Sequence, residues 1–182
     1  VRATEPRDEF QVLWPREIGV EYFADHLALG GDDHWIVLHN RNHPNFELAV
    51  NPIGSRAEPI TVIAGNDRVR LDEIDVTEKF VYLSYRSEAL PRVGLMPITD
   101  DGLGPLSPIS SESELTAYGV GAGGEFNPKY VRLATSSFIE PAKLFDFDPD
   151  TGATLLRKQG EVLGHFDASD YLQERLWVTA DD

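Results

Sequence analysis

Three alternating aspartates form the most suggestive metal-binding pattern in the chain. Asp146, Asp148 and Asp150 follow the series D-x-D-x-D, which supplies calcium ligands in loops of the EF-hand type. Such loops also need Gly at position six and Glu at position twelve, where this chain has Thr151 and Arg157. The pattern therefore favours a polar strand end that runs into a hairpin turn, and we predict no metal site here.

A group of histidines offers a second set of metal ligands. His39 and His43 are four residues apart, with His34 nearby, and on a helix this spacing would place two ligands on one face. The neighbouring residues instead predict a strand and then a loop that contains Pro44, so the spacing loses this meaning. We interpret these histidines as strand-end and loop residues.

Ser169 lies among His165, Asp167 and Asp170, which are the residue types of a hydrolase triad. Triad members converge from distant segments rather than from neighbouring positions. The chain also contains neither G-x-S-x-G nor S-x-x-K, two motifs that carry a nucleophilic serine. We therefore assign no catalytic residue to this chain, and no cofactor-binding or metal-binding residue.

The segment YGVGAGGEF is rich in glycine, at Gly119, Gly121, Gly123 and Gly124. A glycine-rich loop cradles phosphate when a helix follows it, but here we expect a turn at Asn127 and then a strand. We favour a strand at a crowded place of the fold, where small residues let other backbones approach closely.

The three tryptophans, Trp14, Trp35 and Trp177, have two interpretations. Together with the Phe and Tyr residues they could form a platform for a sugar or a peptide, or they could fill the core between stacked sheets. The sequence leaves both interpretations open for each of them.

Composition limits the classes of function. The 182 residues carry a net charge of −15, which disfavours binding to nucleic acid and to anionic membrane surfaces. The absence of cysteine excludes disulfides, zinc–thiolate sites and a cysteine nucleophile. No stretch reaches the roughly 20 apolar residues of a membrane span, and Val1–Phe10 lacks the apolar run of a signal peptide. We expect a cytoplasmic protein and, because the chain does not begin with Met, a piece of a longer one.

Strands are the elements that must position all of these residues. Short runs alternate polar and apolar residues, turn residues separate them, and no window of helical length carries a 3.6-residue period. The runs group into three units of four strands. In chain order, strands are expected at 21–27, 35–39, 46–51 and 60–64, then 69–76, 79–86, 92–98 and 107–109, then 115–121, 130–138, 142–147 and 153–159.

Repeated units of four antiparallel strands are typical of the blades of a β-propeller. The sequence therefore predicts an all-β fold of about three four-stranded antiparallel blades in an open arc. The expected partition is a single partial propeller over 1–182, with the end of a preceding blade at 1–20, blades at 21–68, 69–114 and 115–166, and an exit strand at 167–182. The first of these segments includes a strand candidate at Phe10–Trp14.

The segment from Tyr130 to Asp182 resembles the end of the N-terminal β-propeller of the prolyl oligopeptidase family of serine peptidases. The resemblance lies in Ser136, Ser137 and Pro141, the turn Asp146–Gly152, Lys158-Gln159 with Glu161-Val162, Phe166-Asp167, Tyr171 with Glu174-Arg175, and the final Ala-Asp-Asp. Upstream, WPREIGVEYFADHL and LHNRNHPNFELAV extend it back to Trp14. These details look closest to the oligopeptidase B branch, which cuts after basic residues in short peptides.

The resemblance implies a seven-bladed propeller that caps an α/β-hydrolase domain of the same parent chain. The catalytic triad would then lie outside this segment, which alone is expected to be inactive. The propeller would restrict the active site to short, unfolded peptide substrates, admitted as it opens and closes against the hydrolase domain. The acidic balance adds the expectation that negative charge attracts basic peptides.

Other functions remain open beside this one. Post-proline cleavage by an enzyme of the same family is the nearest alternative, because the residues that set specificity would lie in the hydrolase domain. A free-standing propeller-like module that binds peptide or protein is the second, and a small independent β enzyme is the third. In any of these cases an isolated open arc leaves apolar faces and strand edges unpaired, so we expect the chain alone to self-associate.

Overall fold

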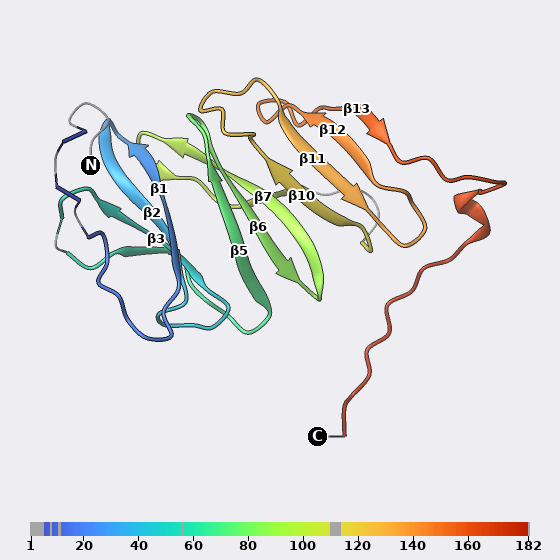
Figure 1. The fold of residues 1–182 in the computed structure, drawn as a ribbon, viewed down its shortest axis with the longest axis horizontal. Helices are drawn as coiled ribbons and strands as arrows, with labels where there is room; N and C mark the ends of the chain where they lie inside the picture. Colours follow the sequence, from blue (N-terminus) through green and yellow to red (C-terminus); the bar gives the residue numbers. More distant parts are fainter. Residues whose placement is uncertain (1–5, 8, 11, 56, 110–113, 182) are drawn as a thin grey trace.

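The computed structural model describes residues 6–7, 9–10, 12–55, 57–109 and 114–181. Their secondary structure consists of strands and one short 3-10 helix, and no helix among them is long and apolar enough to cross a membrane. The strands form three antiparallel sheets that follow one another along the chain and stand side by side (Figure 1). The all-β fold and the open arc of antiparallel sheets predicted from the sequence are confirmed.

The first sheet is a meander in which each strand pairs with the next one along the chain. Its first hairpin turns at Gly30 and Gly31, whose φ angles of 58° and 85° fit the tight turn that matches the twist of paired strands. The register places Leu38 opposite Leu48, and both are fully buried. The strands are β1 (Tyr22–Leu29), β2 (Asp32–His39), β3 (Glu47–Pro52) and β4 (Ile60–Ile63).

The second sheet differs from a simple four-stranded blade, because two short strands share the place beside its third strand. Pro105 and Pro108 lack the N–H that a continuous ladder needs, which accounts for the division. A Cβ at Gly94 would lie 2.8 Å from Leu106 Cδ1, so glycine lets the returning chain approach closely. The strands are β5 (Val69–Val76), β6 (Phe80–Ser87), β7 (Leu90–Thr99), β8 (Gly102–Leu103) and β9 (Ser107–Ile109).

The third sheet is again a four-stranded meander. Its last hairpin contains the turn that the sequence predicts: Asp148 Oδ1 accepts the N–H groups of Asp150 and Thr151, and Gly152 has a φ of 73°. The strands are β10 (Ala117–Gly121), β11 (Val131–Ser136), β12 (Lys143–Phe147) and β13 (Thr154–Gln159).

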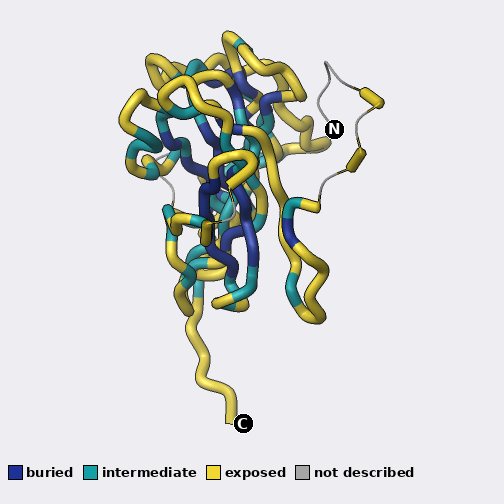
Figure 2. Tube along the Cα trace, turned by 90° about the vertical axis from the view of Figure 1, so that its left-hand side faces the viewer, coloured by how far each residue is buried: buried dark blue, intermediate teal, exposed yellow. Residues whose placement is uncertain are grey.

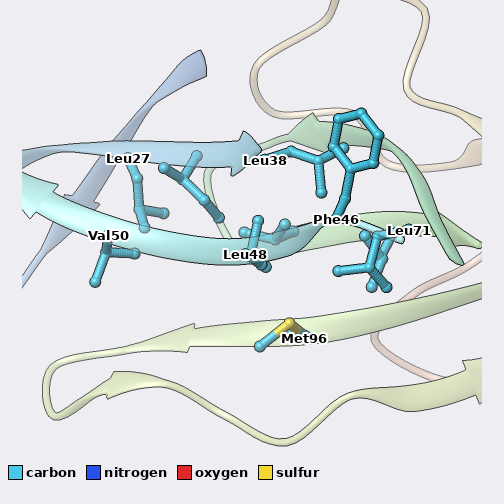
Figure 3. Packing of buried hydrophobic residues seen from close by; sticks show 10 residues of the cluster. Leu27, Leu38, Phe46, Leu48, Val50, Leu71 and Met96 are labelled. Carbon is cyan, nitrogen blue, oxygen red and sulfur yellow. The ribbon is translucent and has the colours of Figure 1, made fainter. Parts of the chain in front are cut away.

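Two apolar cores lie between the sheets. The first joins the first and second sheets, and Figure 3 shows part of it, with Leu38 and Leu48 on one side and Leu71 and Met96 on the other. The second core joins the second and third sheets around Tyr82 and neighbouring apolar residues. Each sheet therefore buries an apolar face only because another sheet stands against it.

The strand predicted at Phe10–Trp14 is absent among the described residues of that segment. Phe10 and Val12 are 92% and 78% exposed, whereas Trp14 is buried, with its ring centre 5.5 Å from that of Tyr22 and 4.8 Å from that of His39. Alternation in the sequence indicates a strand, but a strand also needs a neighbour to pair with. Here the segment is held through Trp14 instead, whose ring packs on Tyr22 and His39 and whose carbonyl oxygen accepts the Tyr22 hydroxyl at 3.1 Å.

The predicted exit strand at 167–182 is also absent among the described residues. Asp167 accepts the N–H of Ser169 at 2.9 Å and caps the 3-10 helix Ala168–Asp170. The chain then runs away from the sheets as an exposed segment (Figures 1 and 2), and Leu172 is 82% exposed. A period of two in the sequence forms a strand only where another strand offers hydrogen bonds, and the structure describes none beside this segment.

Candidate functional site

The three alternating aspartates have three different partners. Asp146 lies between the guanidinium groups of Arg132 and Arg157, Asp148 holds the hairpin turn, and the Asp150 carboxylate forms an ion pair with Lys79. In the part of the chain that the structure describes, no group of three His, Cys, Asp or Glu side chains could hold a metal ion. The aspartates are thus used in ion pairs and in a turn.

The three histidines singled out in the sequence do not converge. His34 Nδ1 lies 3.0 Å from the carbonyl oxygen of Asp32, and His43 Nε2 lies 3.3 Å from a carboxylate oxygen of Asp67. His39 is buried beneath Trp14, and this burial lowers the pKa of its imidazole below the ordinary value, although Glu47 opposes the shift. Their arrangement corresponds to loop and strand-end residues.

Ser169 does not have the geometry of a nucleophile. Its hydroxyl donates to Asp167 Oδ1 at 2.7 Å, and this carboxylate also caps the 3-10 helix. The same hydrogen bonds lower the pKa of Asp167. A nucleophilic serine instead donates its proton to a base such as histidine, so the cluster is a helix cap.

The glycine-rich segment differs from what we expected. Gly119 and Gly121 lie in β10, so the expected strand is confirmed. A Cβ added at either would meet nothing within 4 Å, so the expected crowding is wrong for the described residues. Gly123 and Gly124 have φ angles of 70° and 78°, which places them in a turn. The N–H of the preceding Ala122 donates to Asp75 Oδ2 in the second sheet, so this segment connects the second and third sheets.

The tryptophans divide between the two interpretations. Trp14 is a buried residue with the guanidinium of Arg41 4.4 Å from its ring centre, and Trp35 is half-buried in β2. Trp177 is 71% exposed, with Arg175 5.3 Å from its ring centre. Of the three tryptophans, Trp177 is therefore the one that leaves most of its surface open to an external partner.

Polar contacts join the second and third sheets at both ends of their strands. At one end, Lys79 Nζ lies 2.9 Å from Asp150, and Asp75 accepts the N–H of Ala122 at 2.7 Å. At the other end, Arg92 donates to two carbonyl groups of the segment before β10. With the apolar core between them, these contacts fix the two sheets as a single body.

The C-terminal segment touches both of these sheets at the end where the chain leaves β13. Arg175 forms an ion pair with Glu88 at 2.8 Å and donates to the Glu88 carbonyl at 3.1 Å. Gln173 accepts the N–H of Phe138 at 3.3 Å. The segment is thus tied to the β6–β7 hairpin and to the β11–β12 loop while its apolar residues stay exposed.

A cleft of about 620 Å³ opens beside the same segment, between β9 and the third sheet. Its floor is formed by Tyr118, Leu133, Phe145 and Phe147, and Gln173 lies at its edge. Such a floor suits apolar side chains.

These contacts had no signal in the sequence. Arg175 and Glu88 are 87 residues apart and Lys79 and Asp150 are 71 apart, so no local spacing relates the partners. Positions this distant are brought together only by the stacking of sheets. A prediction of which turns meet at each end of the arc would have been needed to find them.

Comparison with known proteins agrees with this arrangement. The sequence model described as "Prolyl oligopeptidase, N-terminal beta-propeller domain" matches residues 1–160. Dipeptidyl aminopeptidase BI of Pseudoxanthomonas mexicana is 31% identical over 95% of this chain and 23% of its own length. The match therefore covers nearly all of this chain and under a quarter of its relative.

Solved structures show the same relationship. An oligopeptidase B from Trypanosoma brucei, in a closed form with covalently bound antipain, matches 88% of this chain and 23% of its own, with a TM-score of 0.77 and 25% identity. A prolyl endopeptidase structure shares the fold, with a TM-score of 0.66 and 16% identity over 83% of this chain and 21% of its own. The chain belongs to the prolyl oligopeptidase family of serine peptidases, as part of the N-terminal β-propeller domain.

Proposed function

We propose that this chain is the gating, size-filtering segment of a serine oligopeptidase that hydrolyses short peptides after basic residues. The observation that carries the proposal is the three-sheet arc, whose fold and sequence are both similar to oligopeptidase B over most of the chain. Cleavage after basic residues rests on that similarity, because the residues that set specificity would lie in the hydrolase domain.

The way the sheets are held supports gating. An apolar core lies between each pair of neighbouring sheets, and polar contacts join the second and third sheets at both ends of their strands. In the parent propeller, a narrow opening surrounded by such sheets would admit an extended peptide and stop a folded domain, which is too wide to pass. Relative movement of the propeller and the catalytic domain would then admit the substrate.

We further propose that the blades span 21–68, 69–114 and 115–166, and that residues 1–20 belong to a preceding blade. An α/β-hydrolase domain of the same parent protein would supply the serine, histidine and aspartate, so the present chain alone would be inactive. The absence of G-x-S-x-G, a motif that carries a nucleophilic serine, supports the proposal that this chain alone is inactive. We propose a cytoplasmic location for the parent protein, which cell fractionation would check.

The test uses the full-length protein and blocked fluorogenic peptides that differ only in the residue before the scissile bond. We expect kcat/KM for Arg and Lys to exceed that for Ala by about a hundredfold or more, because a charged side chain requires a matched pocket. The same Arg sequence should be cleaved in a ten-residue peptide and resist cleavage in a loop of a folded protein. Equal cleavage of the two would contradict gating, even if the preference for Arg holds.

The same set of peptides would distinguish two alternative specificities. Preferred cleavage after Pro would place the protein with the prolyl endopeptidases. The relative named dipeptidyl aminopeptidase BI favours a second alternative, the release of dipeptides, which requires a free amino terminus on the substrate. No cleavage of any peptide by the full-length protein would leave a peptide-binding module as the better account.

We also propose that the 182-residue chain self-associates when it is isolated. Its exposed apolar side chains include Phe23, Ile60, Leu155 and Leu176, which lie at strand edges and on the C-terminal segment. Sedimentation over a hundredfold range of concentration should show a rising average mass. A strictly monomeric profile across that range would contradict the proposal.

A further inference from the structure

A small cluster of side chains holds the segment before β1 to the first sheet, in blue beside β1 in Figure 1. Trp14 is buried there, and its carbonyl oxygen accepts the hydroxyl of Tyr22 at 3.1 Å. Its ring centre lies 4.8 Å from that of His39 and 4.4 Å from the guanidinium carbon of Arg41. The same guanidinium forms an ion pair with Glu17 at 3.4 Å. We call these residues the Trp14 cluster.

His39 places a buried titratable group in this cluster. The residue is 4% exposed, and Tyr22 lies opposite it on β1. On the other side, Glu47 of β3 is 6% exposed and has a carboxylate oxygen 3.7 Å from His39 Nδ1. The same oxygen accepts the side-chain amide of Asn42. A charge formed on this imidazole would therefore lose most of its hydration.

The surroundings of His39 suit an imidazole that is neutral. The backbone N–H of Arg41 donates to His39 Nδ1 at 3.4 Å, so this nitrogen serves as an acceptor. A proton at Nδ1 would remove that acceptor and set two N–H groups against each other. The imidazolium would also stand beside the Trp14 ring, which already holds the Arg41 guanidinium, and like charges repel. The Glu47 carboxylate favours the proton, but burial is the larger effect and lowers the pKa of His39.

The other contacts of the segment are exposed hydrogen bonds through one asparagine. Asn40 Oδ1 accepts the N–H of Glu21 at 2.7 Å, and Asn40 Nδ2 donates to the carbonyl oxygen of Gly19 at 3.3 Å. Among the described residues, no strand pairing joins 12–20 to a sheet. Exposed hydrogen bonds and an exposed ion pair contribute little, so the segment can open at a smaller free-energy cost than the sheets.

We infer that protonation of His39 opens the Trp14 cluster and releases residues 12–20 from the first sheet while the three sheets stay folded. In the open state the imidazole meets water, so it takes up a proton more readily than in the closed state. A proton, like any ligand, shifts an equilibrium toward the state that binds it better. The closed state is therefore favoured above pH ~6.5, and a falling pH populates the open state. The groups that face the imidazole from the elements packed around it are Tyr22, Glu47, Arg41 and Trp14, with Glu17 acting through Arg41.

The experiment measures hydrogen exchange of the full-length protein by mass spectrometry at pH 7.5 and 5.5, with exchange times scaled for the change in intrinsic rate. Peptides that cover residues 14–22 contain the hydrogen-bonded N–H groups of Val20 and Glu21, and peptides from β6 report on the sheets. Protection of 14–22 should fall about three- to tenfold at the lower pH, since one proton shifts an equilibrium at most tenfold per pH unit. At both pH values β6 should stay far better protected. Equal protection of the two regions would mean that the segment opens only by global unfolding, which would overturn the inference.

Two variants and one control identify the group that titrates. His39→Gln keeps a polar side chain that cannot take up the proton, so protection of 14–22 should no longer depend on pH. Glu47→Gln removes the carboxylate that favours the proton in the closed state, so the loss of protection should persist and extend to lower pH. His26→Gln, at an exposed histidine of β1 paired with Asp33, should leave the loss as in the unsubstituted protein.

The inference fails if His39→Gln retains the loss of protection, or if either of the other two substitutions abolishes it. Should His39→Gln fail to fold, Glu47→Gln still decides, because a persistent loss supports the inference and an abolished loss overturns it.

Discussion

Tyr82 and Leu83 are neighbours in β6, yet they are buried in different cores. Leu83 is fully buried in the cluster shared with the first sheet, and Tyr82 is 1% exposed in the cluster shared with the third. Successive residues of a strand point to opposite faces, so one strand serves two interfaces. The second sheet has no solvent-facing side at this position, which is what a blade between two other blades requires.

Truncation of the first of these interfaces should be costly. Leu83→Ala removes a fully buried side chain and leaves a cavity, so we expect a loss of about 2–5 kcal/mol in the free energy of unfolding. Tyr82→Phe is the matched control in the same strand, because it keeps the ring and removes only the hydroxyl; its effect should stay below about 1.5 kcal/mol. Denaturation in urea measures both. Equal losses in the two variants would contradict the two-core description.

Stability should fall as the pH drops through the titration of His39. Burial lowers the pKa of this histidine in the folded protein, so the unfolded chain, with a pKa near 6.5, takes up the proton first. The contribution of neutral His39 to the free energy of unfolding is fully present above pH ~6.5. It is lost as the pH falls toward the lower pKa of His39 in the folded protein. The groups that face the imidazole are Glu47, Arg41 and the ring of Trp14.

The Tm measured at pH 7.5 and at pH 5.5 checks this expectation. His39→Gln should reduce the difference between the two values, whereas His26→Gln, at an exposed histidine paired with Asp33, should leave it as in the unsubstituted protein. A pH dependence that is the same in both variants would remove His39 as its source.

The contact between Arg175 and Glu88 should protect the C-terminal segment from proteolysis. Arg175→Ala removes both the ion pair and the hydrogen bond to the Glu88 carbonyl, so we expect cleavage within 171–181 to become several times faster. Glu88→Gln keeps the carbonyl acceptor and should have a smaller effect, since an exposed ion pair contributes only about 0–1 kcal/mol. Limited proteolysis followed by mass spectrometry gives the rates. Equal rates in all three proteins would show that the contact does not hold the segment.

Negative charge should accelerate the capture of basic peptides. The chain has a net charge of −15, and attraction of this kind is screened by salt. For the full-length protein, kcat/KM for an Arg peptide should fall several-fold between 20 and 300 mM salt, while that for a neutral peptide of the same length should change little. If kcat/KM depended equally on salt for the two peptides, electrostatic attraction of basic substrates would be excluded.

The strands could be predicted because their signals lie within short stretches of the sequence. The run Phe80–Leu83 has the aromatic and apolar residues of a strand buried on both faces, and the Asp148–Gly152 segment has the residues of a tight turn. The prediction at Phe10–Trp14 was wrong because alternation does not reveal whether a partner strand is present. The same reason applies to the segment after Asp167.

The contact between Glu78 and Phe126 could not be predicted, because the two residues belong to turns of different sheets that are far apart in the sequence. The N–H of Glu78 donates to the carbonyl oxygen of Phe126 at 2.6 Å. The two segments meet only when the sheets stack, and the sequence of each is that of an ordinary loop.

The most direct test of the account is the intact mass of the natural full-length protein after treatment with a fluorophosphonate. If this chain is the propeller segment of a serine oligopeptidase, the protein should have about four times the 20.3 kDa mass of the chain, as its coverage of the relatives implies, and should carry one covalent adduct. A protein of about the mass of this chain, without an adduct, would contradict the account and leave a propeller-like binding module in its place.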